Sequence, residues 1–234
     1  MTLVGTAATV VLLRDGAHGV EVLLLERPRH TGTFAGAWVF PGGRVDPEDY
    51  DAAGSVPPDL QAEPRNPEGE LAAARIAGVR ETAEEASLVL APDALVDLSC
   101  WVPPLQAPKR LRTWFFLAPA PAGEIRLNPG ELIDHAWLTP AEALGLHRDG
   151  NMLLVAPTFV TLTVLQQFQN TAAALAYAAS AQPETYSSRL LDGYEPDAVI
   201  AWHGDDQYPA EGAGQPGSRH RLVMRGSDWR YERS

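Results

Sequence analysis

Short apolar runs rich in leucine and β-branched residues mark the start of the chain. Residues 6–13 ("TAATVVLL") and 19–27 ("GVEVLLLER") are two such runs, separated by the turn-like segment "RDGAHG". Runs of this length bounded by turn residues are typical of buried strands, so the pattern predicts an N-terminal hairpin. A glycine-containing stretch follows, and residues 38–40 are expected to form a short strand within it.

The pattern changes between residues 46 and 70, where Asp, Glu, Pro and Gly dominate and no apolar period is visible. Such a segment has little apolar surface to bury, so we expect an inserted surface loop with room for one helical turn. The next segment, residues 71–87, is rich in alanine and places Leu71, Ile76 and Val79 at helical spacing. It is predicted to be a helix.

Three downstream segments have the residue types and the apolar alternation of strands, and they are separated by loops that contain Pro or Gly. They cover residues 94–102, 112–120 and 132–138. A helix is expected after Thr139, because Pro140 follows directly and Glu142 stands at the third position, as in a capping box.

The last third of the chain begins with a long apolar and alanine-rich segment. Residues 157–180 are predicted to form one long, well-packed helix. The residues after it are loop-rich, with strand candidates at 198–203 and 221–225.

Composition narrows the class of protein. The chain has 234 residues and is 45% hydrophobic, which suits one well-packed core with an appendage. The formal net charge of −12 disfavours a nucleic-acid partner, since a nucleic-acid groove needs clustered Lys and Arg. A protein this acidic would need a metal ion to hold an anionic small substrate.

Cysteine use and the N-terminal segment bear on location. Cys100 is the single cysteine, so no internal disulfide can form and a structural zinc cluster is disfavoured. The first apolar run has no basic region before it and is closed early by Arg14 and Asp15. No apolar stretch of 18 residues follows. These features predict a soluble, unexported, cytoplasmic protein with no membrane partner.

The predicted helix over residues 71–87 carries a dense group of carboxylates. Glu81, Glu84 and Glu85 stand at i, i+3 and i+4 and therefore share one face, where each like-charged pair costs roughly 0.2–0.5 kcal/mol. Arg80 reaches Glu84 at i+4 but leaves the other two without a local cation. A hard divalent metal ion would supply the missing charge. Alone, such a cluster is more often a solvated acidic helix face.

The glutamates follow an earlier glycine motif, and the pair resembles a known family. "FPGG" at residues 40–43 followed by "RETAEE" at residues 80–85 resembles the Nudix hydrolases, whose signature is G-x5-E-x7-R-E-U-x-E-E-x-G-U, with U aliphatic. The 36 residues between Gly43 and Arg80 exceed the uninterrupted spacing by 23, so the box carries the insertion already noted.

Two further departures and one open position mark this split box. Thr82 stands where an aliphatic residue is usual, and Ser87 stands where the family has glycine. The first signature glutamate has no clear equivalent, because counting forward from Gly43 reaches Asp49 and counting back from Arg80 reaches Ala72. That role stays open.

The resemblance implies a fold and a domain plan. The fold would be an α/β/α sandwich with a mixed sheet, followed by a helical and loop-rich C-terminal extension. Residues 1–180 would form the Nudix domain, with residues 46–70 inserted in the box. Residues 181–234 would form an extension packed on the same domain, closing over the substrate or forming a homodimer interface.

The resemblance also implies a chemistry and its residues. Mg²⁺ or Mn²⁺ would be held by Glu81, Glu84, Glu85 and the backbone carbonyl of Gly42, with Arg80 bracing the glutamates. The catalytic base would be Glu84 or Glu131. Glu131 resembles the acidic residue that precedes a tryptophan strand in many relatives, and its role would be that of a base or of a fourth ligand. Candidates to contact the substrate at the rim are Arg27, Arg44, Arg112 and Phe40.

The implied reaction is hydrolysis of the pyrophosphate bond in a nucleoside diphosphate linked to another moiety, which releases a nucleoside monophosphate. The features after the box look like the subgroup that contains coenzyme A diphosphatase relatives. Gly32, however, stands where a coenzyme A signature expects arginine. Coenzyme A-type compounds, ADP-ribose, NADH and dinucleotides all remain open as substrates.

Two alternatives compete with this interpretation. One is a non-catalytic Nudix-like module that binds a nucleotide or regulates, which loss of a ligand glutamate would have supported. The other is a plain acidic helix on a structural protein. The six histidines lack metal-site spacing, and no serine or cysteine has a nucleophile motif. Trp101, Trp114 and Trp137 are expected mainly in the core, although one could stack a base at the rim.

Overall fold

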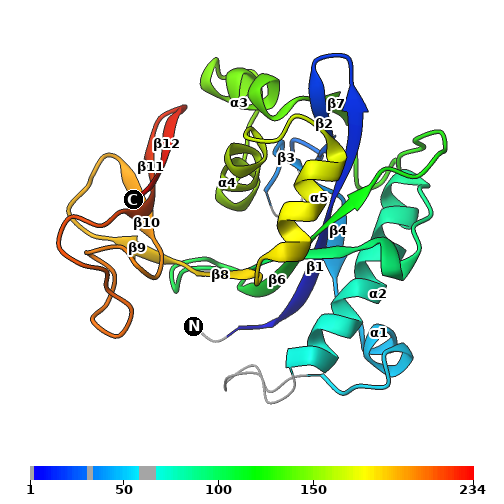
Figure 1. Cartoon of the computed structure of the whole chain (residues 1–234), viewed down its shortest axis with the longest axis horizontal. Helices are drawn as coiled ribbons and strands as arrows, with labels where there is room; N and C mark the ends of the chain where they lie inside the picture. Colours follow the sequence, from blue (N-terminus) through cyan, green and yellow to red (C-terminus); the bar gives the residue numbers. More distant parts are fainter. Residues whose placement is uncertain (1–2, 31–33, 58–66) are drawn as a thin grey trace.

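The computed structural model describes residues 3–30, 34–57 and 67–234, and its centre is a mixed sheet with helices on both faces (Figure 1). The strands of this sheet are β1 (Gly5–Gly16), β2 (Gly19–Glu26), β3 (Trp38–Val39), β4 (Gly42–Arg44), β5 (Val96–Val102), β6 (Leu111–Pro119), β7 (Asp134–Leu138) and β8 (Glu184–Ser187). The helices are α1 (Pro47–Ala52), α2 (Pro67–Ala86), α3 (Pro140–Arg148), α4 (Ala156–Leu165) and α5 (Thr171–Ser180), with a 3₁₀ turn η1 (Pro92–Ala94). This is the predicted α/β/α sandwich.

The glycine motif lies where the strands β1 and β2 separate from each other. β1 and β2 form the predicted hairpin, with Leu13 opposite Val22. Farther from the turn they separate, so that β2 pairs with β3 and β1 pairs with β4. Gly42 therefore lies opposite Thr9, in the middle of the sheet. The separation of the two strands places Gly42 and Gly43, at the start of the signature, beside α2, which carries its glutamates.

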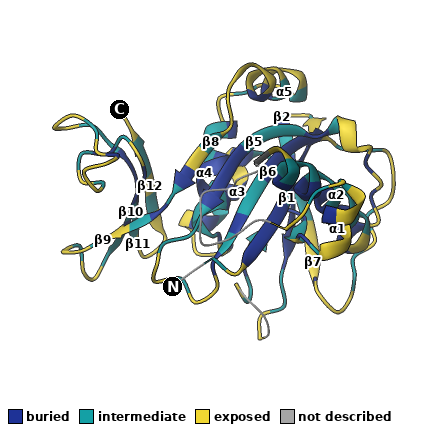
Figure 2. Cartoon of the chain, turned by 90° about the horizontal axis from the view of Figure 1, so that it is seen from below, coloured by how far each residue is buried: buried dark blue, intermediate teal, exposed yellow. Residues whose placement is uncertain are grey.

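The two faces of the sheet have different partners. On one face, Val10, Leu12 and Leu23 pack against the alanines of α2, while on the other Val11 and Leu24 pack with α4 and α5. The alternation follows from the two-residue period of a strand. Figure 2 shows the central strands largely buried and the outer turns of the helices exposed. Both strands of the hairpin are buried, as predicted.

The predicted helix over residues 71–87 is confirmed and begins earlier, at Pro67. The prediction of a single helix over residues 157–180 is wrong. α4 ends at Leu165 and α5 begins at Thr171, because the side chain of Asn170 accepts a hydrogen bond from Ala173 N at 2.9 Å and caps a new helix.

The inserted segment contains the expected helical turn, which is α1. Its remaining stretch includes residues 58–66, which lie outside the described residues. In the described part of the chain, no helix is both long and apolar enough to cross a membrane.

The C-terminal extension is built from strands, so the prediction of a helical extension is wrong. β8 adds to the main sheet by parallel pairing with β5. A second, antiparallel sheet then contains β9 (Arg189–Leu191), β10 (Ala198–Ala201), β11 (His220–Arg225) and β12 (Asp228–Arg233). The loop between β10 and β11 is fixed by a buried ion pair between Asp205 and Arg221.

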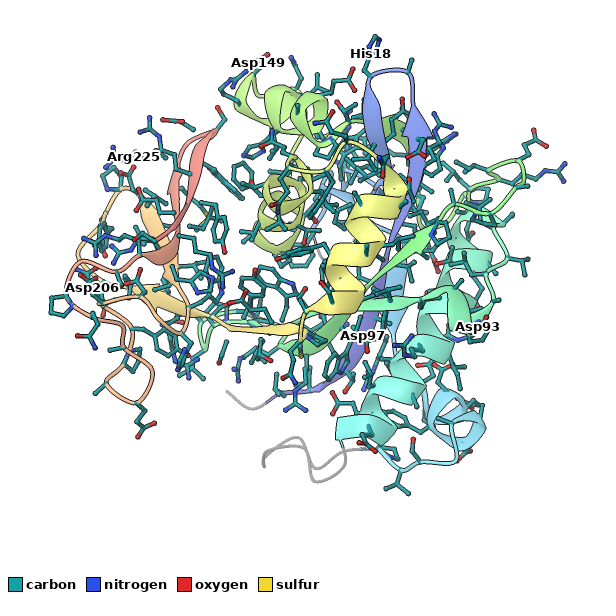
Figure 3. All side chains as sticks on the ribbon, in the orientation of Figure 1. His18, Asp93, Asp97, Asp149, Asp206 and Arg225 are labelled. Atoms are coloured by element: carbon teal, nitrogen blue, oxygen red, sulfur yellow. The ribbon has the colours of Figure 1, made fainter. Side chains whose placement is uncertain are left out.

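Aromatic and histidine side chains join this second sheet to the α/β sandwich. Trp101 of β5 stacks on Tyr186 of β8 with ring centroids 3.9 Å apart, and Trp202 meets both rings edge-on. His147 of α3 lies 4.6 Å from the Trp229 ring of β12, centroid to centroid. Figure 3 shows side chains filling the space between α4 and the strands β11 and β12.

The surroundings of the two buried histidines at this junction favour the neutral imidazole. Nδ1 of His147 bonds the carbonyl of Met152 at 3.0 Å, and Nδ1 of His220 bonds that of His203 at 2.8 Å. Neither Nε2 atom has a hydrogen-bond partner among the described residues. Burial lowers the pKa of both imidazoles below the ordinary value of 6.5.

We therefore expect acid to weaken the junction. The unfolded chain binds these protons at higher pH than the folded protein, so stability present above pH 6.5 is lost as the pH falls through the lowered pKa values. Both histidines should contribute to this loss, because burial lowers the pKa of each. Thermal denaturation between pH 7.5 and 5 should show a smaller decrease for His147→Phe than for the wild type. His18→Ala, at the exposed tip of the hairpin (Figure 3), should follow the wild type; equal slopes for all three proteins would contradict the assignment.

Candidate functional site

The C-terminal half of α2 brings Glu85 against the glycine motif. Glu85 is 4% exposed, and its carboxylate accepts a hydrogen bond from the backbone N–H of Gly42 at 2.8 Å. Gly42 has a φ of +155°, and a side chain there would collide with the carbonyl of Ala8. Position 42 therefore requires glycine, because its backbone lies close to both β1 and the Glu85 carboxylate.

Glu81 lies one turn earlier, between Gly43 and Arg80. A Cβ atom on Gly43 would lie 2.3 Å from the Glu81 carboxyl carbon, so the second glycine also makes room for a carboxylate. Glu81 accepts a hydrogen bond from Arg80 Nη1 at 2.9 Å, and Glu84 accepts one from the same atom at 3.3 Å. Glu84 itself is exposed. The predicted common face of the three glutamates is confirmed.

The carboxylates also affect one another's pKa. Burial raises the pKa of Glu85 to about 7, and the nearby charges of Glu81 and Glu131 act in the same direction. The Gly42 N–H and the charge of Arg27 oppose the rise. Burial likewise raises the pKa of Glu81, with Glu84 and Glu131 adding to the effect. Glu131 and Arg27, predicted from separate parts of the chain, are therefore brought near the glutamate helix.

Arg80 is held by an acidic residue whose role the sequence left open. Asp49, on α1 and 3% exposed, accepts hydrogen bonds from Arg80 Nε at 3.2 Å and from Nη2 at 2.9 Å. Asp49 also accepts from Asp46 N, which fixes the first turn of α1. The pKa of Arg80 is raised above its ordinary value, chiefly by the hydrogen bonds to Asp49. Of the two positions that the signature count allowed, Asp49 is the one that meets the arginine.

The two departures from the signature are accommodated locally. Thr82 is fully buried, but its hydroxyl donates to the carbonyl of Gly78 at 2.7 Å, so no polar group is left unpaired. Ser87 has a φ of +57°, the left-handed conformation that glycine adopts most easily, and its hydroxyl donates to the carbonyl of Arg126 at 3.0 Å. Neither change disturbs the carboxylates.

Two predicted substrate contacts need correction. Phe40 is 2% exposed and packs edge-on against Phe115 in the core. Arg112 is 8% exposed and forms an ion pair with Glu70 at 2.8 Å, near the start of α2. Both sit in sequence beside the site, but Arg112 occupies an inward-facing position of β6, and Phe40, in the link between β3 and β4, packs into the core. Arg44 stays exposed and donates to the carbonyl of Val4 at 3.2 Å.

The residues suit a hard divalent cation in donor type and in charge. Carboxylate oxygens and a backbone carbonyl are the ligands that Mg²⁺ and Mn²⁺ prefer. Within residues 3–30, 34–57 and 67–234, no three acidic, histidine or cysteine side chains already converge on one point that could hold a metal ion. Glu81 faces Arg80 instead, and Glu85 faces the Gly42 N–H. A cation would therefore compete with these two contacts.

The Asp49–Arg80 contact predicts a structural effect of mutation. Asp49→Asn removes the charge that receives the arginine, so the free energy of unfolding should fall by about 1–3 kcal/mol. Chemical denaturation measures this change. Asp51→Asn, at an exposed position of the same helix α1, is the matched control and should stay within about 0.5 kcal/mol of wild type. Equal stability of the two variants would argue against the contact.

Comparison with known proteins addresses the identity of the site. The sequence model of the NUDIX domain matches residues 4–154. A NUDIX hydrolase from Alicyclobacillus acidocaldarius has 27% identity and a TM-score of 0.65, over 78% of this chain and 100% of that one. A MutT NUDIX hydrolase from Burkholderia pseudomallei has 21% identity and a TM-score of 0.45, over 68% and 95% of the two chains. Among curated proteins, none matches the chain.

The matched region contains the hairpin, the glycine motif, α2 and β7, and it therefore includes every carboxylate of the site. Members of this family hydrolyse nucleoside diphosphate derivatives and generally use divalent metal cations. The chain belongs to the Nudix family and is a Nudix-type pyrophosphohydrolase.

Proposed function

We propose that the protein hydrolyses the pyrophosphate bond of a nucleoside diphosphate linked to a second moiety, with Mg²⁺ or Mn²⁺ as cofactor. The observation that carries this proposal is the position of Glu81 and Glu85, whose carboxylates lie against Gly43 and Gly42 on one face of α2; burial raises the pKa of both, and the charge of Glu131 adds to the rise. A protein that bound only a neutral ligand would have no need of acidic side chains placed in this way. The substrate classes remain coenzyme A-type compounds, ADP-ribose, NADH and dinucleotides.

Glu81, Glu84, Glu85 and the carbonyl of Gly42 would hold the cation. When bound, it would neutralise the phosphates and lower the pKa of coordinated water. Arg80 would keep the glutamates in place from behind, since Asp49 holds its guanidinium while Nη1 contacts Glu81 and Glu84. Removing Asp49 would thus loosen the ligand set without removing a ligand.

The proton of the attacking water would pass to Glu84 or Glu131. Both carboxylates are exposed, so water can reach either of them. Glu84 shares the Arg80 guanidinium with Glu81, whereas Glu131 follows Asn128, whose N–H donates to the carbonyl of Glu85 at 3.2 Å. Arg27, whose charge acts on Glu85, would bind a phosphate oxygen. Arg44 remains a second candidate for this role.

Hydrolysis by the wild type should depend on the cation and on Glu85. We expect Mg²⁺ or Mn²⁺ to support release of a nucleoside monophosphate from at least one of coenzyme A, ADP-ribose, NADH or a diadenosine polyphosphate. Glu85→Gln should lower kcat/KM by roughly 10²-fold or more. Glu84→Gln and Glu131→Gln separate the two candidate bases, because loss of the base should lower kcat by about 10²–10⁴-fold.

The matched control is Glu68→Gln, an exposed glutamate on the first turn of the same helix α2. Its kcat/KM should equal that of the wild type. If the wild type binds nucleotides but cleaves no member of the panel, the non-catalytic binding module becomes the better account.

Cation binding can be measured separately from turnover. A cation bound only by the folded protein raises its stability by RT ln(1 + [M]/Kd), about 2.7 kcal/mol when the concentration is 100 times Kd. Mg²⁺ or Mn²⁺ should therefore raise the melting temperature of the wild type and of Glu68→Gln. The rise should be much smaller for Glu85→Gln, and an equal rise in all three proteins would place the cation elsewhere.

A further inference from the structure

An open cavity of about 690 Å³ lies on the α2 side of the sheet, away from the second sheet. Its walls come from the hairpin, from β7, from the segment after β6 and from Leu88, which follows α2. The volume falls in the range of small-molecule sites. No residue of this cavity belongs to the glutamate cluster, so the site described above does not explain it.

The cavity has a flat cationic and aromatic surface on one side. The guanidinium carbon of Arg14 lies 4.3 Å from the centroid of the Trp137 ring, a cation–π contact. The ring of Trp137 is partly buried against the core and partly open. Indole rings and guanidinium planes are both surfaces on which nucleobases stack.

The charges around the cavity do not suit a phosphate group. Arg14 is already paired with Glu21 at 2.7 Å, and Glu124 is paired with Arg126 at 3.0 Å. The rest of the lining is mainly apolar, with small side chains between Ala120 and Gly123. A neutral, planar group with polar edges fits this surface better than an anion.

One loop connects the cavity to the glutamates. The segment 120–125 forms a cavity wall, and the residues that follow bind the last turn of α2. Arg126 N donates to the carbonyl of Ala86 at 3.1 Å, and Asn128 N donates to that of Glu85 at 3.2 Å. Glu131, at the end of the same loop, acts electrostatically on Glu85. The cavity and the cluster thus share the end of α2, with Leu88 only three residues beyond Glu85.

We infer that this cavity binds the nucleobase of the substrate, stacked on the outer face of the Arg14 guanidinium that lies over the Trp137 ring, while the phosphates lie at the glutamates. The inference rests on the proposed function for the identity of the ligand. It makes Trp137 and Arg14 binding residues that determine base affinity, with no part in the proton transfer. It also links the cavity wall formed by residues 120–125 to Glu131, which lies at the end of the same loop.

The first test uses adenosine, which has no phosphate and needs no metal. Its binding to the wild type is followed by calorimetry and by the change in tryptophan emission. Trp137→Ala should weaken binding roughly 2- to 30-fold, because the Arg14 guanidinium loses the ring that supports it. Trp137→Phe should restore most of the affinity, and Arg14→Ala should weaken it. The control Arg230→Ala, an exposed and ion-paired arginine on β12, should bind as the wild type does.

A second variant tests the same inference if Trp137→Ala does not fold. Ala122 lines the cavity and is exposed, so Ala122→Trp should fill the space, abolish adenosine binding and leave the cation-induced rise in melting temperature intact. In assays of hydrolysis, Trp137→Ala should raise KM with kcat nearly unchanged, as expected for loss of ground-state binding.

The outcomes separate this inference from the proposed function. Hydrolysis with a KM that neither Trp137→Ala nor Ala122→Trp changes would overturn the inference and leave the function standing. Adenosine binding that is lost in both variants, in a protein that cleaves nothing, would overturn the function and leave the cavity assignment standing. Adenosine binding of equal strength in all variants would place the base elsewhere and overturn the inference.

Discussion

The close approach of α2 to the central sheet is the constraint on which the site depends. Small residues make it possible: alanines face the sheet, and a Cβ atom on Gly78 would lie 2.9 Å from Val10 Cγ2. The approach presses Glu85 onto the N–H of Gly42 and Glu81 against Gly43. The approach therefore buries the carboxylates of Glu81 and Glu85, and this burial raises the pKa of both. A bound cation would convert this unfavourable charge into binding energy.

Much of the fold could be predicted from periodicity, because the hairpin and α2 have strong local patterns that tertiary contacts reinforce. The break between α4 and α5 was missed, since both flanks are apolar and only the cap at Asn170 marks the boundary. The second sheet was only partly found. Its strands are short, and their burial depends on rings contributed by distant elements, such as Trp101 against Tyr186. The pattern of neighbouring residues in the sequence does not reveal such distant partners.

The site, like the fold, could be predicted only in part from the sequence. Spacing alone placed Glu81, Glu84 and Glu85 on one face, but it could not decide between Asp49 and Ala72 across the insertion. The decision comes from α1, which turns the Asp49 carboxylate toward Arg80. Phe40 and Arg112 were assigned to the rim by position in the chain. The direction of Arg112 depends on which face of β6 it occupies, and that of Phe40 depends on the link between β3 and β4; both point inward to partners far away in sequence.

The central claim is that the crowded carboxylates form a cation site. Anomalous diffraction from crystals soaked in Mn²⁺ tests it most directly, because it locates the ion without relying on turnover. The account predicts a peak within coordination distance of the Glu81 and Glu85 carboxylates, with Glu81 moved away from Arg80. A Mn²⁺ peak elsewhere, with Glu85 still on the Gly42 N–H and Glu81 still on Arg80, would contradict it.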